Sequence, residues 1–215
     1  MPNPNDLSQR RPDEALLVID VQYDFCPGGS LAIAEGDRIV PAVNRLARSF
    51  EHVILTQDWH PADHASFASQ HPGTEPFGTI AMPYGDQTVW PDHCVQGTRG
   101  AEFLDTLSLP HAELILRKGF RRTIDSYSAF FENDRTTPTG LAGYLRERGL
   151  RRLFCVGLAF DICVRFSAED AVRQGFEAIV IEDACRAVDL HGTRQAAYQG
   201  FQASGVTLAQ SAQVA

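Results

Sequence analysis

Short apolar runs recur along the chain at intervals that suit strands alternating with helices. The clearest run covers residues 153–158, all apolar or small, as expected for a strand that is buried on both faces. Similar short runs indicate further strands at residues 15–20, 53–56, 113–117, 176–181 and 206–208.

Between these runs, apolar residues recur every three or four positions, which is typical of amphipathic helices. Segments 37–50, 140–148 and 193–201 have this spacing. Strands that alternate with helices predict a mostly parallel sheet covered by helices on both faces. The sequence therefore predicts a single three-layer α/β domain over residues 15–215. Residues 1–14 are polar and contain three prolines, which predicts a loose N-terminal tail.

A further helix follows the run 153–158, and we expect the side chain of Asp161 to cap it. Cys163 then lies in the first helical turn, where unpaired N–H groups and the helix dipole favour a thiolate. On this interpretation the pKa of the thiol is lowered and Cys163 is a nucleophile. The alternative is a small buried hydrophobic residue, which is the usual role of a free cysteine.

Reactive or charged groups follow the ends of three predicted strands. Asp20 ends one run, Lys118 follows another, and Cys163 comes after the third. Neighbouring parallel strands bring their carboxyl ends to one edge of a sheet, so these side chains can converge. A thiol, a carboxylate that moves protons and an ammonium group form a plausible catalytic set. Taken singly, Asp20 could equally brace its loop, and Lys118 could be a solvated strand-end charge.

The long segment 60–100 is rich in proline and glycine and shows no helical or strand period. A loop of this length inside a domain is usually functional. Asp58 and His60 stand two positions apart at a strand end and so point to the same side. With His93 and His64 they offer carboxylate and imidazole groups, which bind divalent transition metals. We expect a metal site here, apart from the strand ends that supply the thiol; the alternative is surface histidines in a polar loop.

Composition narrows the class of partner. The formal net charge of −8 argues against nucleic acid or an anionic membrane as the main partner. No apolar run approaches the roughly 20 residues of a membrane span. Five cysteines without a framework spacing indicate reduced thiols. These features predict a cytoplasmic protein.

These motifs together resemble the nicotinamidase (pyrazinamidase) branch of the isochorismatase-like cysteine hydrolases. The resemblance extends from residue 15 to about residue 208. The segments that carry it are, in order, VIDVQYDFCPGGSL (18–31), TQDWHPADHASFAS (56–69), WPDHCVQGTRGAEF (90–103), RKGFRRTIDSYSAF (117–130) and VGLAFDICV (156–164). The wider superfamily shares the Asp, Lys and Cys, whereas the metal segment distinguishes the nicotinamidase branch.

The resemblance implies an isochorismatase-like hydrolase fold and an activity. That activity is the hydrolysis of nicotinamide, and also of pyrazinamide, to the acid and ammonia, as a step of NAD salvage. By position, Asp20 is the general acid and base, Lys118 is its charged partner, and Cys163 is the nucleophile that forms a thioester.

The resemblance also implies a metal centre. One divalent metal ion, zinc or iron, is expected on Asp58, His60 and His93. His64 matches a position that ligates the metal in only some relatives.

The resemblance also implies a substrate pocket. The N–H groups of Ala159 and Cys163 are expected to form an oxyanion hole, after a cis peptide bond that precedes Ala159. Phe160 departs from the family pattern, in which threonine is common at this position. The residues expected to sandwich the aromatic ring of the substrate are Phe25, Trp90 and Tyr127.

Two other functions remain open on the sequence. A related amidase or ureide hydrolase of the same superfamily would share the catalytic set but bind a non-aromatic amide. A non-catalytic metal-binding protein would keep the metal residues and an inert Cys163. The sequence also leaves open whether several copies of the chain assemble.

Overall fold

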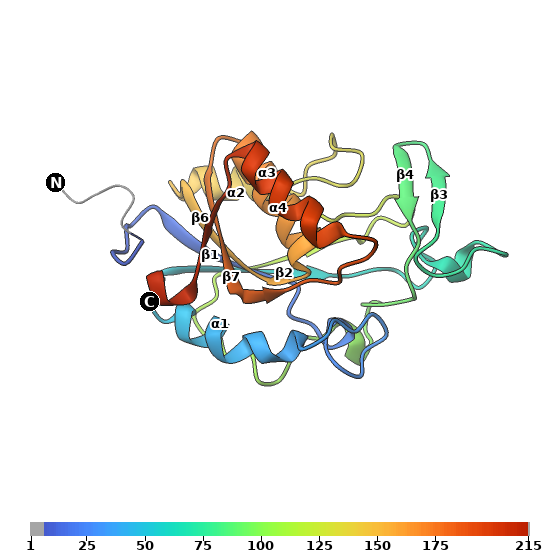
Figure 1. Ribbon diagram of the computed structural model, residues 1–215, viewed down its shortest axis with the longest axis horizontal. Coiled ribbons are helices and arrows are strands. Elements are labelled where there is room, and N and C mark those ends of the chain that lie inside the picture. Colours follow the sequence, from blue (N-terminus) through green and yellow to red (C-terminus); the bar gives the residue numbers. More distant parts are fainter. Residues whose placement is uncertain (1–6, 215) are drawn as a thin grey trace.

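Six strands form one parallel sheet at the centre of the molecule (Figure 1). The computed structural model describes residues 7–214 and orders these strands β5-β2-β1-β6-β7-β8. Every neighbouring pair is parallel, as predicted. The bounds are β1 Glu14–Ile19, β2 His52–Asp58, β5 Leu114–Lys118, β6 Arg152–Leu158, β7 Glu177–Arg186 and β8 Thr207–Ala209.

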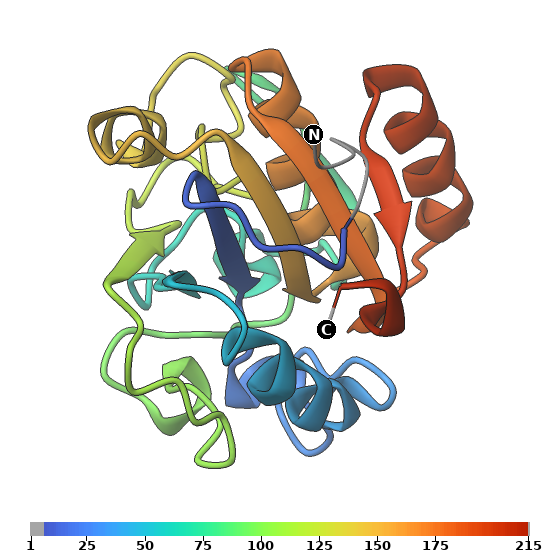
Figure 2. The same ribbon diagram turned by 90° about the vertical axis from the view of Figure 1, so that its left-hand side faces the viewer.

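Helices cover both faces of this sheet, with more of them on one side (Figures 1 and 2). Leu16 and Val18 of β1 belong to the core on the side of α1, whereas Ala15 and Leu17 face the other core. Because successive side chains of a strand point to opposite faces, the two cores are separate. The predicted three-layer arrangement is confirmed. Helix α1 (Val40–Ala47) covers one face, and α2 (Leu141–Glu147), α3 (Arg165–Arg173) and α4 (Thr193–Ser204) cover the other.

The strand order changes direction between β1 and β6. From β1 the chain continues outward to β2 and β5, and from β6 it continues to β7 and β8. Ile19 pairs with Thr56 on one side and with Gly157 on the other. A Cβ atom on Gly157 would lie 2.0 Å from the carbonyl oxygen of Ile19, so only glycine permits this approach. Ligands of open parallel sheets bind at such a switch point, beyond the carboxyl ends of the strands.

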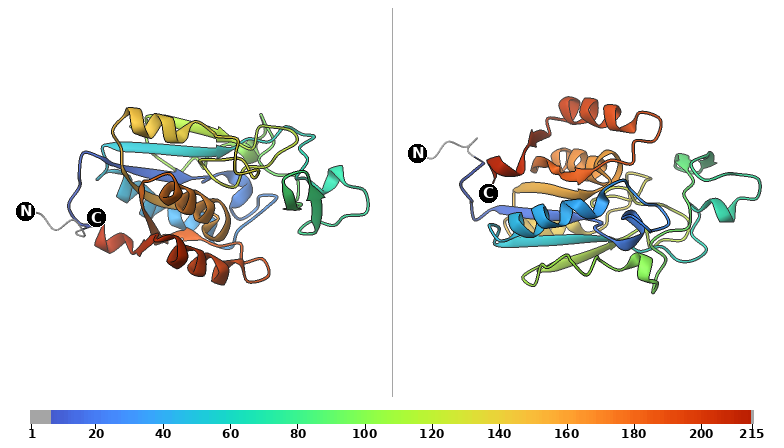
Figure 3. Two further views of the ribbon diagram at one scale, coloured as in Figure 1. Left: turned by 90° about the horizontal axis from the view of Figure 1, so that it is seen from above. Right: turned by 60° about the horizontal axis from the view of Figure 1, so that its bottom comes forward.

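The long segment after β2 contains an antiparallel hairpin that the sequence did not predict. Strand β3 (Thr79–Met82) pairs with β4 (Gly85–Thr88), and the hairpin extends from one end of the molecule (Figures 1 and 3). Nearly all of its side chains are exposed or half-buried. Because no apolar alternation is needed there, the pattern gave no clear sign of strands, and the prediction of a long irregular segment missed this short hairpin.

The segment after β6 also differs from the prediction. Residues Phe160–Val164 form a π-helical turn before α3, and the side chain of Asp161 caps neither element. Its carboxylate instead accepts hydrogen bonds from the N–H groups of Val188, at 3.0 Å, and Asp189, at 2.8 Å, and from the Thr193 hydroxyl. The predicted cap was wrong, and Asp161 anchors the loop before α4.

Part of the expected N-terminal tail belongs to the fold. Residues 1–6 lie outside the described part of the chain. Glu14 opens β1, is buried and forms an ion pair with Arg152 at 2.9 Å. The ordered unit therefore begins before residue 15. Among residues 7–214, no helix has both the length and the apolar character needed to cross a membrane.

Candidate active site and metal centre

The three predicted catalytic residues meet at the switch point of the sheet. Lys118 is fully buried, and its Nζ lies 2.8 Å from Asp20 Oδ2 and 3.5 Å from Cys163 Sγ. The Thr56 hydroxyl donates to Asp20 Oδ1 at 2.6 Å, and Lys118 Nζ donates to the Ser126 carbonyl at 3.0 Å. Residues from the ends of β1 and β5 and from the turn after β6 therefore form one contiguous group.

Burial controls the proton affinity of this group. It raises the pKa of the Cys163 thiol well above its usual value; Lys118 opposes the rise and Asp20 adds to it. Burial also raises the pKa of Asp20 against the opposing effect of Lys118. The predicted lowering of the thiol pKa was wrong, because burial beside carboxylates outweighs one ammonium group and a helix start. A protonated thiol beside a carboxylate is suited to proton transfer during nucleophilic attack.

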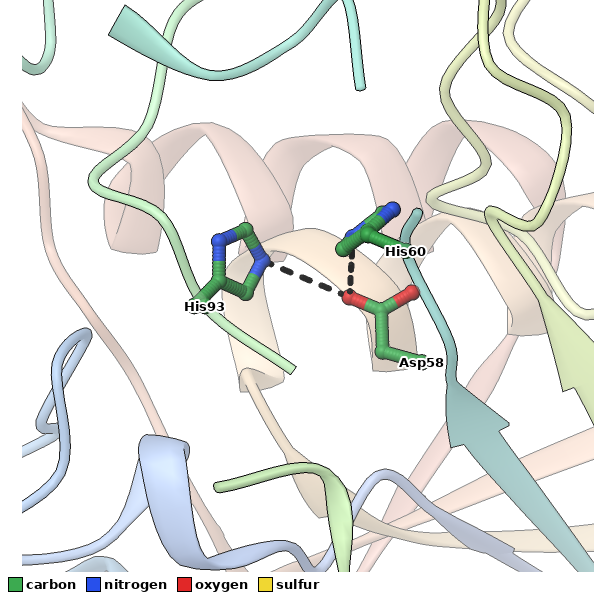
Figure 4. Close-up of side chains that lie close together, drawn as sticks. All are labelled: Asp58, His60 and His93. Carbon is green, nitrogen blue, oxygen red and sulfur yellow. Dashed lines mark hydrogen bonds and ion pairs between the residues drawn. The ribbon is translucent and has the colours of Figure 1, made fainter. Parts of the chain in front are cut away.

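The predicted metal ligands also converge (Figure 4). The Nε2 atoms of His60 and His93 approach Asp58 Oδ2, at 3.1 Å and 3.5 Å. Each Nδ1 lies 2.8 Å from a backbone carbonyl oxygen, that of Gly119 for His60 and that of Pro91 for His93. A donated Nδ1–H leaves Nε2 as the ligand atom, and this is how proteins orient metal-binding imidazoles. Two imidazoles and a carboxylate fit one divalent transition metal.

Gly119 permits the close packing of His60 on the backbone. A Cβ atom at this position would lie 2.4 Å from His60 Cε1, and the φ angle of +65° is rarely adopted by other residues. A larger residue would therefore displace the imidazole that the Gly119 carbonyl orients.

The predicted metal ligands shift each other's proton affinity. Burial alone would raise the pKa of Asp58, but His60 and Lys118 hold it well below its usual value. Burial alone would lower the pKa of His60, but the Asp58 carboxylate raises it to about 8. Metal binding requires a neutral imidazole, so it should release a proton from His60 near neutral pH.

Asp58 belongs to both groups of residues. Lys118 Nζ lies 2.9 Å from Asp58 Oδ1, while Asp58 Oδ2 faces the histidines. The two residues are opposite each other in the register of β2 and β5. The sequence placed the metal site apart from the catalytic strand ends, and the structure instead joins the two through this carboxylate.

His64 does not converge with Asp58 and His93, although its ring lies beside that of His60, with ring centroids 4.4 Å apart. Its Nδ1 accepts from the Ser66 N–H at 3.2 Å and lies 2.7 Å from the Ser66 hydroxyl, and its Nε2 lies 3.3 Å from the Ile124 carbonyl oxygen. With His60 and Asp125 it forms a second set of three donors within 4.8 Å of one another. Asp125 is a site residue that sequence reasoning missed; the available signal was that it is the only carboxylate in the segment 117–130.

A cavity lies between the catalytic group and the metal ligands. Cys163, Asp58 and His93 line it, and Trp90 Nε1 donates a hydrogen bond to the Tyr127 hydroxyl at 3.2 Å in its wall. Flat aromatic rings suit a flat aromatic ligand. The remaining lining residues are Phe25, Leu31, Ile33, Asp125, Ala159, Ile162 and Val188.

Two features around residue 159 bear on the expected pocket. The peptide bond between Leu158 and Ala159 is cis, as the family resemblance implied. Phe160 is buried against Tyr198 and Phe201 and does not line the cavity. Phe160 therefore contributes no side chain to the cavity wall.

Comparisons with known proteins identify the family and agree with the fold. An isochorismatase domain model matches residues 14–213. The chain is 56% identical to a nicotinamidase of Acinetobacter baylyi over 192 residues, 89% of this chain and 90% of the relative. A solved nicotinamidase and pyrazinamidase of Acinetobacter baumanii has a TM-score of 0.95 at 54% identity, covering 96% of this chain and 100% of that one. A pyrazinamidase of Pyrococcus horikoshii in complex with zinc has a TM-score of 0.76 at 34% identity, covering 93% and 99%. The chain belongs to the isochorismatase family, within its nicotinamidase branch.

Proposed function

We propose that this protein hydrolyses nicotinamide to nicotinate and ammonia, and acts on pyrazinamide in the same way, as a step of NAD salvage. One observation carries the proposal: a buried thiol, two metal-ligand side chains and three aromatic rings line the same cavity. The thiol supplies a nucleophile for the carboxamide carbon. The aromatic rings suit the pyridine ring, and the metal ligands suit recognition of its nitrogen atom.

The first half of the reaction forms a thioester. Asp20 accepts the thiol proton as the sulfur of Cys163 forms a bond with the carboxamide carbon. Asp20 then gives the proton to the leaving nitrogen as the C–N bond breaks, and ammonia departs. Lys118 is positively charged at the start of the reaction, because Asp20 and Asp58 hold its pKa well above the usual value despite burial.

The second half clears the thioester. Asp20 takes one proton from water as the new C–O bond forms and returns it to the sulfur as the C–S bond breaks, which restores the thiol. The released acid then ionises to nicotinate. We assign the oxyanion of each tetrahedral intermediate to the backbone N–H groups of Ala159 and Cys163. Removing one such donor typically costs about 3–4 kcal/mol of transition-state stabilisation.

Asp58, His60 and His93 would hold one divalent ion, zinc or iron. Their donor set fits either metal, and a relative with zinc supports the first. When bound, the ion supplies a coordination position for the pyridine nitrogen and so orients the ring. We assign the aromatic sandwich of that ring to Phe25, Trp90 and Tyr127.

We also infer a reducing compartment, such as a cytoplasm, and a small-molecule partner. All five cysteines are free and buried, which supports the first inference. The cavity, which is lined mostly by aromatic and aliphatic side chains, supports the small-molecule partner.

Ammonia release from nicotinamide by the purified protein, with metal content measured on the same sample, tests the proposal. Benzamide is the matched control, because it has the same shape and carboxamide but no ring nitrogen. A site built around a polar contact can reject an analogue that lacks it by about 10⁴-fold. We expect benzamide and aliphatic amides to be nearly inert. Equal rates for benzamide and nicotinamide would exclude recognition of the ring nitrogen, and no ammonia release from nicotinamide would refute the activity.

A further inference from the structure

The β3–β4 hairpin carries one buried side chain, that of Gln87. Its exposed fraction is 1%, whereas every other residue from 79 to 88 is exposed or half-buried. A buried side-chain amide is unfavourable unless its hydrogen-bonding groups are satisfied. The partners of Gln87 therefore show what the hairpin holds in place.

Two of these partners belong to the wall of the substrate cavity. Gln87 Nε2 lies 2.9 Å from the Tyr127 hydroxyl and 3.0 Å from Asp125 Oδ2. Both Tyr127 and Asp125 line the cavity that contains Cys163. The other contacts of the amide are with the Thr88 carbonyl at 2.7 Å, the Tyr84 hydroxyl at 3.1 Å and the Asn133 side-chain amide at 3.0 Å.

The Tyr127 hydroxyl is held from two directions. Trp90 Nε1 donates to it at 3.2 Å, and Gln87 Nε2 donates at 2.9 Å. The Tyr127 ring also packs against the rings of Trp90 and Phe166, and the two hydrogen bonds add a directional restraint at its polar end. Gln87 reaches the hydroxyl from an otherwise exposed hairpin.

We infer that Gln87 is a positioning residue, which fixes the Tyr127 ring and the Asp125 carboxylate in the wall of the substrate cavity. This inference rests on the proposed function, because it takes nicotinamide as the ligand whose ring contacts the cavity wall. Gln87 itself does not line the cavity, so it acts through Tyr127 and Asp125. The hairpin is then part of the binding site, although its own side chains lie outside it.

Steady-state kinetics of Gln87 variants distinguishes a positioning role of this side chain from a general contribution to stability. Gln87→Met keeps the length of the side chain and removes its hydrogen bonds. Gln87→Glu keeps an acceptor but faces Asp125 with a second carboxylate. We expect either to raise KM for nicotinamide about tenfold with kcat within about threefold, because a lost wall contact weakens ground state and transition state alike. Asp86→Asn, an exposed change on the same hairpin, is the matched control and should leave both constants unchanged.

A double-mutant cycle tests the route through Tyr127. Tyr127→Phe removes only the hydroxyl, and it should raise KM by itself even if the position 87 variants do not fold. In this background, Gln87→Met should raise KM by clearly less than its roughly tenfold effect in the wild type, because coupled groups are not additive and only the wall contact with Asp125 is left to lose. Full additivity, or an unchanged KM in Gln87→Met, would overturn the inference.

A binding measurement without turnover tests this inference separately from the proposed function. In metal-loaded Cys163→Ala protein, calorimetry with nicotinamide should give a Kd that rises about tenfold on adding Gln87→Met. Binding that is unaffected by Gln87→Met would refute the role of Gln87 alone. If nicotinamide does not bind even with Gln87 intact, it is the proposed substrate that is wrong.

Discussion

Lys118 is the only lysine in the chain, and its replacement by methionine should destabilise the protein as well as inactivate it. The side chain is fully buried, and Nζ lies 2.8 Å from Asp20 Oδ2 and 2.9 Å from Asp58 Oδ1. Methionine keeps much of the side-chain volume and removes the positive charge. Two buried carboxylates are then left beside each other without the ammonium group between them.

The expected loss of stability is large because Lys118 and its two carboxylate partners, Asp20 and Asp58, are buried. Removing one partner of a buried ion pair costs about 3–5 kcal/mol, and we expect this decrease in the free energy of unfolding near neutral pH. Burial already raises the pKa of Asp20 against the effect of Lys118, so the variant should raise it further. A carboxyl with a raised folded-state pKa stabilises the fold at low pH, and that contribution is lost as pH rises through this pKa. The decrease in the free energy of unfolding of Lys118→Met, relative to the wild type, should therefore be smaller near pH 5 than near pH 8.

Denaturant unfolding of both metal-loaded proteins at the two pH values measures this directly. Adding Asp20→Asn to Lys118→Met removes one of the two carboxylates and should recover part of the lost stability. Arg122→Met is the matched control, because it removes the cation of an exposed ion pair with Asp63 and should change stability by less than about 1 kcal/mol. An equally small, pH-independent change in Lys118→Met would refute the role of Lys118 in compensating the two carboxylates.

Three further predictions concern the thiol and the metal. Iodoacetamide should label Cys163 no faster than a free thiol at neutral pH, with a rate that rises with pH, because burial raises its pKa; peptide mapping that shows rapid labelling would contradict this. Asp58→Ala should lose the metal and reduce the nicotinamide rate by orders of magnitude while Cys163 remains open to slow alkylation; full metal content by elemental analysis would exclude Asp58 as a ligand. His64→Ala should keep the metal, because His64 does not converge with Asp58 and His93; an empty site in this variant would make His64 a ligand.

Structural features that depend on residues close together in the sequence could be predicted. The buried strand β6 is a continuous apolar run, and Cys163 follows it at a fixed distance along the chain. The ends of β1 and β5 placed Asp20 and Lys118 at the same edge, since the carboxyl ends of parallel strands meet there. The sequence pattern was therefore sufficient to predict a parallel sheet and to place these three residues at one edge of it.

Features that depend on pairing across the fold could not be predicted. The contact between Asp58 and Lys118 follows from the register of β2 with β5, which local periodicity does not specify. The raised pKa of Cys163 reflects its depth and the carboxylates that surround it, whereas the sequence suggested only a helix start. Gln87 gave no signal, because a single buried polar residue in an exposed hairpin produces no hydrophobic pattern.

The most direct test concerns Cys163 as the nucleophile. Ammonia release from nicotinamide should be measured for the wild type and for Cys163→Ala, with folding and metal content matched between the two samples. Loss of one small side chain at the cavity wall should leave the fold and the metal ligands intact, since Asp58, His60 and His93 remain. We expect rapid release by the wild type and no more than a trace by Cys163→Ala. Substantial release by a metal-loaded, folded Cys163→Ala protein would contradict the thioester mechanism.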